Sequence, residues 1–131
     1  MSAVGVPRFL GAEVARAIHD RQLAEHGGLA GVKDEGLLQS AIARPINKHG
    51  YGEDDLCALA AAYAFGIARN HPFADGNKRT AWVMARVFLI VNGVEIAFDK
   101  ADATRTMLDV AAGEVSEDEL AAWFRAHLSA E

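Results

Sequence analysis

The chain has 131 residues, a net charge of -5 at pH 7, 51% hydrophobic residues and one cysteine. This length predicts a single domain, 1–131, whose core needs no disulfide or structural metal. The negative charge disfavours a general nucleic-acid binder, which requires a basic face, while a local basic cluster at 78–79 stays open. The first ten residues lack the regions of a signal peptide, and the longest apolar tract, 81–91, is too short to span a bilayer. Together with the lone cysteine, this predicts a cytoplasmic protein that binds neither membrane nor nucleic acid.

Hydrophobic periodicity and helix-ending residues predict an all-α fold of about six helices. The first helix covers 12–25 and ends before two glycines. Its apolar face is expected to consist of Val14, Ala17, Ile18 and Ala24. The second follows the N-cap Asp34 and should stop at Pro45, because proline lacks the N–H that a helix interior needs. The segment 45–54 then contains a proline, an asparagine and two glycines, and we expect it to be a flexible surface loop.

The remaining helices are predicted from the second half of the chain. A mostly apolar helix runs from Glu53 to about Asn70, with an acidic first turn as the helix dipole prefers. The helix 77–91 is apolar on nearly every side, which predicts that it is the buried central helix. Asp99 caps the next helix, after a segment that allows a short extended piece. The sequence SEDEL at 116–120 is a capping box and opens the last helix.

The segment HPFADGNKRT (71–80) lies between two predicted helices and contains most of the chemically interesting side chains. The following helix begins near Asn77, so its first N–H groups lack intrahelical partners and lie at the positive end of the helix dipole. Such a helix start is suited to phosphate. Gly76 lets a ligand approach the backbone closely, and Lys78 and Arg79 add positive charge. The segment therefore predicts an anion-binding site.

Two further residues of this segment would make the anion site a transferase. Asp75 offers an oxygen ligand to Mg²⁺, which commonly binds through one or two carboxylates and substrate phosphates. His71 offers a base that suits proton removal from a hydroxyl at neutral pH. Each residue alone also has a structural interpretation: Asp75 as a helix cap, His71 as a turn histidine and the two cations, Lys78 and Arg79, as solvated first-turn residues. As a set on one short turn, they favour phosphoryl-type transfer.

The single cysteine, Cys57, lies in the apolar run LCALAAAYAF. This context favours a small buried helix residue. A nucleophilic pairing with a histidine stays open, although no local signature supports it.

The segment 71–80 resembles the Fic/Doc family motif, HxFx[D/E]GN followed by a variable residue and Arg. The matching positions are His71, Phe73, Asp75, Gly76, Asn77 and Arg79. The likeness extends to 19–45 and 111–116, so that it covers most of the chain. It implies an all-α domain that uses ATP and Mg²⁺. The residue roles it implies are His71 as the catalytic base, Asp75 as the metal ligand, and Gly76, Asn77, Lys78, Arg79 and Arg69 as the nucleotide and phosphate site.

Two departures decide which branch of the family the chain resembles. Nucleotidyl-transferring Fic enzymes have a second glycine where this chain has Lys78, and a second arginine where it has Trp82. Doc-type toxins share the lysine and lack that arginine, and they are understood to phosphorylate a threonine of elongation factor Tu and so stop translation. The resemblance thus implies a toxin that acts as an ATP-dependent kinase on a Thr/Ser hydroxyl of a translation factor. The alternatives are a protein AMP-transferase and a non-catalytic regulatory module; an RNA-cutting toxin finds little support in the acidic charge.

The resemblance also implies partners and further candidate residues. Doc-type toxins are neutralised by a Phd-like antitoxin whose flexible tail folds as a helix on the toxin, so we expect an exposed apolar groove. No inhibitory [S/T]xxxE[G/N] helix is found in the chain itself. Arg69 matches an arginine of these toxins and either helps bind nucleotide or target, or is a helix C-terminal cation facing water. The segment 45–54 corresponds to the flap that would seat the target peptide. Its His49 and Tyr51 are weak candidates for contacting that peptide, and the favoured alternative is that they are plain loop residues.

Overall fold

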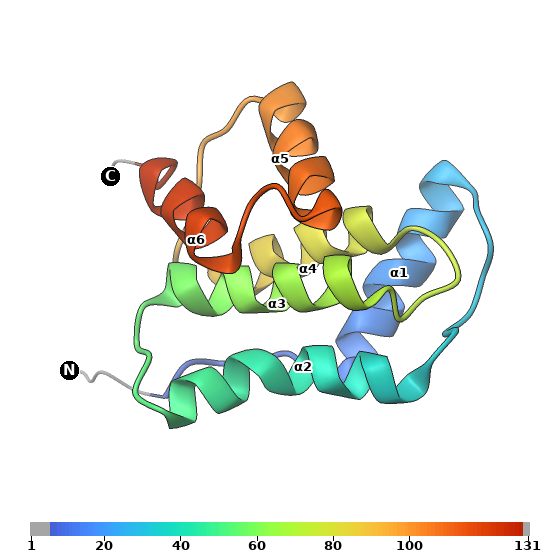
Figure 1. Cartoon of the computed structure of the whole chain (residues 1–131), viewed down its shortest axis with the longest axis horizontal. Helices are drawn as coiled ribbons and strands as arrows, with labels where there is room; N and C mark the ends of the chain where they lie inside the picture. Colours follow the sequence, from blue (N-terminus) through green and yellow to red (C-terminus); the bar gives the residue numbers. More distant parts are fainter. Residues whose placement is uncertain (1–5, 130–131) are drawn as a thin grey trace.

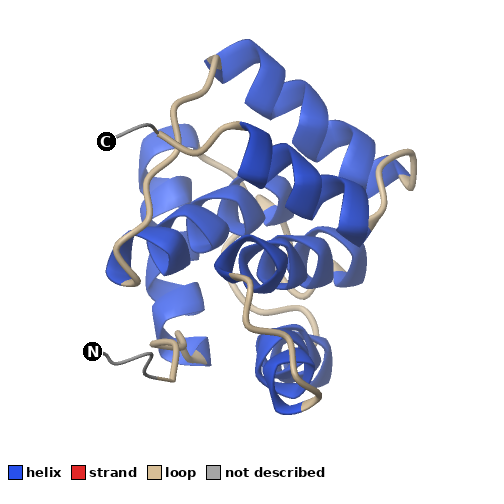
Figure 2. Ribbon diagram, turned by 90° about the vertical axis from the view of Figure 1, so that its left-hand side faces the viewer, coloured by secondary structure: helices blue, strands red, loops and turns tan. Residues whose placement is uncertain are grey.

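The computed structural model describes residues 6–129, which form six α-helices joined by loops (Figures 1 and 2). The helices are α1 (Ala12–His26), α2 (Glu35–Gly50), α3 (Leu56–Asn70), α4 (Asn77–Val91), α5 (Lys100–Ala112) and α6 (Glu117–Ala126). Only two isolated bridges, and no strand, occur in this part of the chain. The all-α prediction is therefore confirmed. None of the helices in residues 6–129 is long and apolar enough to cross a membrane.

Residues 1–5 and 130–131 lie outside the described residues. The expectation that no signal peptide is present falls partly on them. The single domain predicted over 1–131 also includes them and stays a prediction.

Helix starts and ends follow the capping residues of the sequence. Asp34 and Asp99 each accept an N–H three residues on, at 3.0 Å. Ser116 and Glu119 form the reciprocal capping box at the start of α6. Gly113 ends α5 with a φ of +84°, a conformation that favours glycine. The starts of α2, α5 and α6 therefore lie where the sequence predicts them.

Helix α3, rather than α4, is the central helix of the bundle (Figure 1). It packs against α2, α4, α5 and α6, and all but four of its residues are buried. Helix α4 lies beside it and leaves Ile90 half exposed. The prediction that 77–91 occupies the centre is wrong, because the alanine-rich α3 lets neighbours approach on every side. At its closest contact, a Cβ on Gly66 would lie 3.2 Å from the Cα of Ala41 in α2.

The prediction that Pro45 ends the second helix is also wrong. Helix α2 continues through Pro45 to Gly50, and the proline ring is buried. Proline removes one backbone hydrogen bond from a helix interior, a cost that burial of its ring against the core offsets. Residues 45–50 are therefore helical, and the expected flexible loop is reduced to a short turn before α3. The N-cap of α3 is Asp55, so the acidic residues expected in its first turn precede the helix.

The buried face of α1 differs from the predicted one. Ala15 and His19 are the buried residues, whereas Ala17 and Ala24 are exposed. The other two predicted positions, Val14 and Ile18, are partly buried. Because α1 packs mainly against α4, the position of that neighbour sets the buried stripe. This rotation brings a histidine into the interior.

Candidate active site

The turn that joins α3 to α4 begins with a left-handed residue. His71 has φ +52° and ψ +56°, and it is the one non-glycine residue with a positive φ among residues 6–129. Its position before Pro72 disfavours the right-handed α region. The left-handed conformation costs about 1–3 kcal/mol, so the surroundings must hold it in place. The His71 side chain is exposed to solvent.

Asn77 fastens the turn from inside. Its side-chain amide donates to the Phe73 carbonyl oxygen, and its Oδ1 accepts the Phe73 N–H, both at 3.0 Å. Phe73 itself is buried in the core. Since the side-chain amide is already hydrogen-bonded, a phosphate would meet Asn77 at its backbone N–H. The phosphate-binding role of Asn77 stays a prediction.

The connection between α1 and α2 lies along the outer side of the turn. The Ala74 N–H donates to the Gly31 carbonyl at 3.1 Å, and the Lys33 N–H donates to the Pro72 carbonyl at 2.8 Å. An isolated antiparallel bridge joins Val32 to the turn at Phe73. Residues 27–34 therefore support the turn from outside the motif.

The Asp75 carboxylate lies at the junction of these two loops. Its Oδ1 accepts the Gly76 N–H at 2.8 Å, and its Oδ2 accepts the Leu29 N–H at 3.4 Å. A Cβ on Gly28 would lie 2.8 Å from Oδ2, and Gly28 has a φ of +123°. Only glycine fits that position without strain. The N-cap of α4 is Gly76, which has no side-chain cap, so the alternative interpretation of Asp75 as a cap is not supported.

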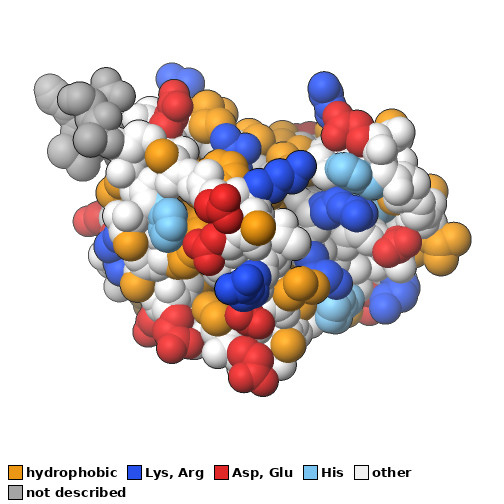
Figure 3. Space-filling view, turned by 90° about the horizontal axis from the view of Figure 1, so that it is seen from above, with side chains coloured by type: hydrophobic (Ala, Val, Ile, Leu, Met, Phe, Trp, Pro, Cys, Tyr) orange, Lys and Arg blue, Asp and Glu red, His pale blue; other side chains and the backbone are white. Residues whose placement is uncertain are grey.

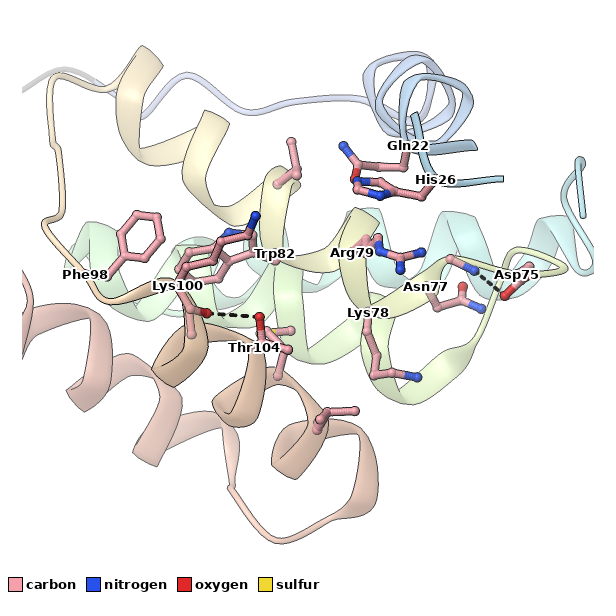
Figure 4. Close-up of a pocket in the computed structure, with 15 residues that line it drawn as sticks. Gln22, His26, Asp75, Asn77, Lys78, Arg79, Trp82, Phe98, Lys100 and Thr104 are labelled. Atoms are coloured by element: carbon pink, nitrogen blue, oxygen red, sulfur yellow. Dashed lines mark hydrogen bonds between the residues drawn. The ribbon is translucent and has the colours of Figure 1, made fainter. Parts of the chain in front are cut away.

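The start of α4 retains the properties of an anion site. Its first N–H groups have no intrahelical partner, as in any helix, and no side chain caps them. Lys78 and Arg79 are exposed and form no ion pair within residues 6–129. Figure 4 places their side chains in the space between α1 and α5. Lys and Arg side chains also gather across the middle of the face in Figure 3.

A pocket of about 480 Å³ contains this helix start. One side is formed by the motif residues Asp75, Gly76, Asn77, Lys78 and Arg79. The other side is largely apolar and comes from α4, α5 and the segment that joins them, with Trp82, Met107 and Phe98 among its residues. Lys100, which the sequence did not indicate, adds a third cation to the lining. One end of the pocket is thus suited to an anionic ligand, and the other end is apolar.

Two predicted site residues do not line this pocket. His71 lies outside its lining on the exposed end of α3. The Arg69 guanidinium lies 5.6 Å from the Phe65 ring, and its Nη1 is 3.2 Å from the position of a Cβ on Gly113. Both of their proposed roles stay predictions. Both side chains would have to act on a group outside the pocket or at its edge.

The metal role predicted for Asp75 would rest on the carboxylate of that residue alone. Residues 6–129 contain no group of three or more His, Cys, Asp or Glu side chains arranged to hold a metal ion. A single exposed carboxylate beside a phosphate site nevertheless fits Mg²⁺, which keeps several waters and binds substrate phosphates. The residues present therefore fit a Mg²⁺ that arrives with a nucleotide.

Cys57 is a buried helix residue, as the sequence favours. Burial, with a smaller contribution from the nearby Asp55 carboxylate, raises the pKa of the thiol to about 11. A nucleophilic cysteine needs the thiolate near neutral pH. The nucleophile interpretation of Cys57 is therefore not supported.

One buried polar residue at the site was missed from the sequence. His19 of α1 is 1% exposed, and its Nε2 lies 2.7 Å from the carbonyl oxygen of Asp75. The two residues are 56 positions apart in the chain. The spacing in the sequence could have indicated this histidine. His19 lies one helical turn after Ala15 and one before Leu23, so a polar residue falls on a stripe of apolar positions and should face inward.

The six-helix bundle and the uncapped, cationic start of α4 together describe an all-α protein with a candidate phosphate site. Sequence comparison shows the family to which this protein belongs. The Fic/DOC family model matches residues 9–89, and the chain belongs to that family. It is 36% identical over 115 residues to a protein named "Protein kinase doc" from Escherichia phage P1, covering 87% of this chain and 90% of that relative. It is 46% identical over 101 residues to "Toxin Doc" from Mycolicibacterium smegmatis, covering 73% and 77% of the two chains.

Proposed function

We propose that the protein is a Doc-like toxin that transfers the γ-phosphoryl group of ATP to a Ser/Thr hydroxyl of another protein. The observation that carries this proposal is Lys78 at the uncapped start of α4, together with Arg79 in the same pocket. Similarity to a relative named as a protein kinase supports the choice of phosphate transfer. Similarity to a second relative named as a toxin supports the biological role.

The residues divide the work of the transfer among them. The first N–H groups of α4, with Lys78 and Arg79, hold the phosphates and offset their charge. Asp75 would hold Mg²⁺, which neutralises charge on the transferred phosphoryl group. His71 takes the proton of the acceptor hydroxyl. The hydroxyl oxygen forms the new P–O bond to the γ-phosphorus while the bond to ADP breaks and ADP leaves. Because His71 is exposed and outside the pocket lining, the acceptor approaches from solvent, as a protein side chain does.

Trp82 is the second residue that favours phosphate transfer over AMP transfer. Its ring packs edge-on against the rings of Phe98 and Trp123, with centroid distances of 5.0 Å and 5.7 Å. Trp82 itself offers no positive charge to a terminal phosphate. Of the three cations named in the lining of the pocket, Lys78 and Arg79 lie together at the start of α4, whereas Lys100 lies alone beside Trp82. The nucleotide phosphates are therefore best neutralised at the Lys78 end of the pocket. We take AMP transfer as the second candidate.

The proposed target is a translation factor of the elongation factor Tu type, and the proposed regulator is a Phd-like antitoxin. The apolar end of the pocket supports the regulator, because Trp82, Phe98 and the half-exposed Leu108 lie together there. An antitoxin tail that folds as an amphipathic helix would bury such a surface. Both partners would be met in the cytoplasm.

ATP labelled at either the α or the γ phosphate tests the reaction type. The protein is incubated with Mg²⁺, elongation factor Tu and each labelled ATP in turn. We expect transfer of the γ label only, whereas transfer of the α label only would establish AMP transfer and refute the kinase proposal. His71→Ala should lower the rate by about 10²–10⁴-fold. Arg79→Ala should weaken ATP binding, and Arg21→Ala serves as its control because that side chain is 79% exposed on α1.

Toxicity in growing cells tests whether catalysis underlies the function. We expect His71→Ala and Asp75→Ala each to relieve growth arrest. If both variants accumulate and arrest growth as strongly as the parent, the chain acts as a non-catalytic binding module.

A further inference from the structure

His19 contacts the active-site turn from the interior of the protein. Its ring lies almost parallel to the Phe73 ring, with centroids 4.0 Å apart and an interplanar angle of 10°. Its Nε2 lies 2.7 Å from the Asp75 carbonyl oxygen. A carbonyl oxygen only accepts, so Nε2 donates this hydrogen bond. The ring does not line the pocket, and His19 therefore acts on a ligand only through the turn.

The peptide group between Asp75 and Gly76 is held at both ends. His19 donates to its carbonyl oxygen, while its N–H donates to the Asp75 carboxylate at 2.8 Å. Gly76 lies close to the His19 ring, since a Cβ there would be 3.8 Å from Cδ2 and 3.9 Å from Nε2. A flip of this peptide would leave the buried His19 donor without a partner, which costs about 1–3 kcal/mol. The orientation of the peptide is thus fixed from α1.

From this geometry we infer that His19 is a positioning residue for the metal and phosphate site. It fixes the 75–76 peptide so that the Asp75 carboxylate and the first N–H groups of α4 are directed at the same ligand. The inference rests on the proposed function of the site, and it adds a residue outside the motif. Its role is separate from packing, because the ring contact with Phe73 and the hydrogen bond to Asp75 use different parts of the imidazole.

Two substitutions separate the hydrogen bond from the packing. His19→Phe keeps an aromatic ring against Phe73 and removes the donor. His19→Gln loses the ring but places an amide Nε2 at a reach similar to that of the imidazole. Ala15→Gly is the control, because Ala15 is fully buried one turn earlier on the same face of α1 and touches neither loop by hydrogen bonding.

The first measurement is the Mg²⁺ dependence of phosphate transfer. We expect His19→Phe to lower kcat or the apparent Mg²⁺ affinity by about 10–100-fold, the usual range for outer-shell hydrogen bonds at metal sites. KM for the acceptor protein should not change. His19→Gln should recover most of the loss despite a lower melting temperature, and Ala15→Gly should lower the melting temperature alone. Equal loss in His19→Gln and His19→Phe, or the same loss in Ala15→Gly, would overturn the inference.

The second measurement needs no activity. Amide hydrogen exchange of Gly76 and Asn77 should accelerate in His19→Phe, with slower exchange restored in His19→Gln. If the parent protein transfers no phosphate but shows this pattern, the proposed function fails and the positioning role stands. If exchange at Gly76 is the same in His19→Phe and the parent, the positioning role is refuted, whatever the activity.

Discussion

Replacing Asn77 with alanine tests whether this side chain serves the turn or the ligand. The substitution removes two hydrogen bonds of 3.0 Å and leaves the N–H and C=O groups of the buried Phe73 without partners. Each bond contributes about 1 kcal/mol, and an unsatisfied buried group costs about 1–3 kcal/mol, so we expect a loss of about 2–4 kcal/mol. For a domain of this size that lowers the melting temperature by about 6–15 °C.

Thermal unfolding followed by circular dichroism gives the melting temperature, and calorimetric titration with ATP and Mg²⁺ below it gives the affinity. Lys78→Ala is the matched comparison, since Lys78 is exposed and unpaired among residues 6–129. We expect it to leave stability within about 0.5 kcal/mol and to weaken ATP binding. Asn77→Asp keeps the acceptor and loses the donor, so its melting temperature should fall between those of Asn77→Ala and the parent. If Asn77→Ala melts with the parent and loses only ATP affinity, the side chain is a ligand and the reasoning is refuted.

Three further predictions concern glycine contacts and the cysteine. Gly28→Ala places a Cβ 2.8 Å from the Asp75 carboxylate and should therefore reduce the Mg²⁺-dependent activity. If the Mg²⁺ dependence of this variant equals that of the parent protein, the contact does not matter for the site. Gly66→Val should destabilise by about 1–3 kcal/mol in urea unfolding, because its Cβ would lie 3.2 Å from Ala41 Cα; a neutral effect would show that α2 and α3 separate easily. Folding raises the pKa of the Cys57 thiol from 9.0 to about 11. Between these pH values the folded protein therefore keeps the thiol proton, whereas the unfolded chain releases it. Stability should therefore fall between pH 9 and 11, less steeply in Cys57→Ala, and equal slopes in the two proteins would contradict this.

The helices could be predicted from the sequence wherever their limits depend on neighbouring residues. Asp34, Asp99 and the Ser116 capping box act within three residues of themselves, so their effect needs no tertiary contact. Pro45 shows the opposite case. Its local preference is to end a helix, but burial of its ring in the packed bundle reverses that outcome. No pattern within α2 reports this burial.

The uncapped, cationic start of α4 was predictable for the same local reason, and its use as an anion site stays a prediction. The uncapped start of α4, Gly76 and the two cations all fall within one turn of helix, so their proximity follows from the chain itself. The contacts that orient the site were not predictable in this way. His19 and residues 27–34 reach the turn from about 40 to 56 positions away, and only the packing of α1 against α4 brings them there.

The motif residues do not hold their turn by themselves. The proposed base and metal ligand, His71 and Asp75, lie on a six-residue turn that contains a left-handed histidine and neither helix nor strand. That turn is held by Asn77 from within the motif, and by His19 and residues 27–34 from outside it. A chain with the same motif but no donor at the position of His19, or with a side chain at Gly28, would display the same residues without fixing the 75–76 peptide. The inferred role of His19 thus predicts that the activity proposed for this chain depends on α1 and its following loop as well as on the motif.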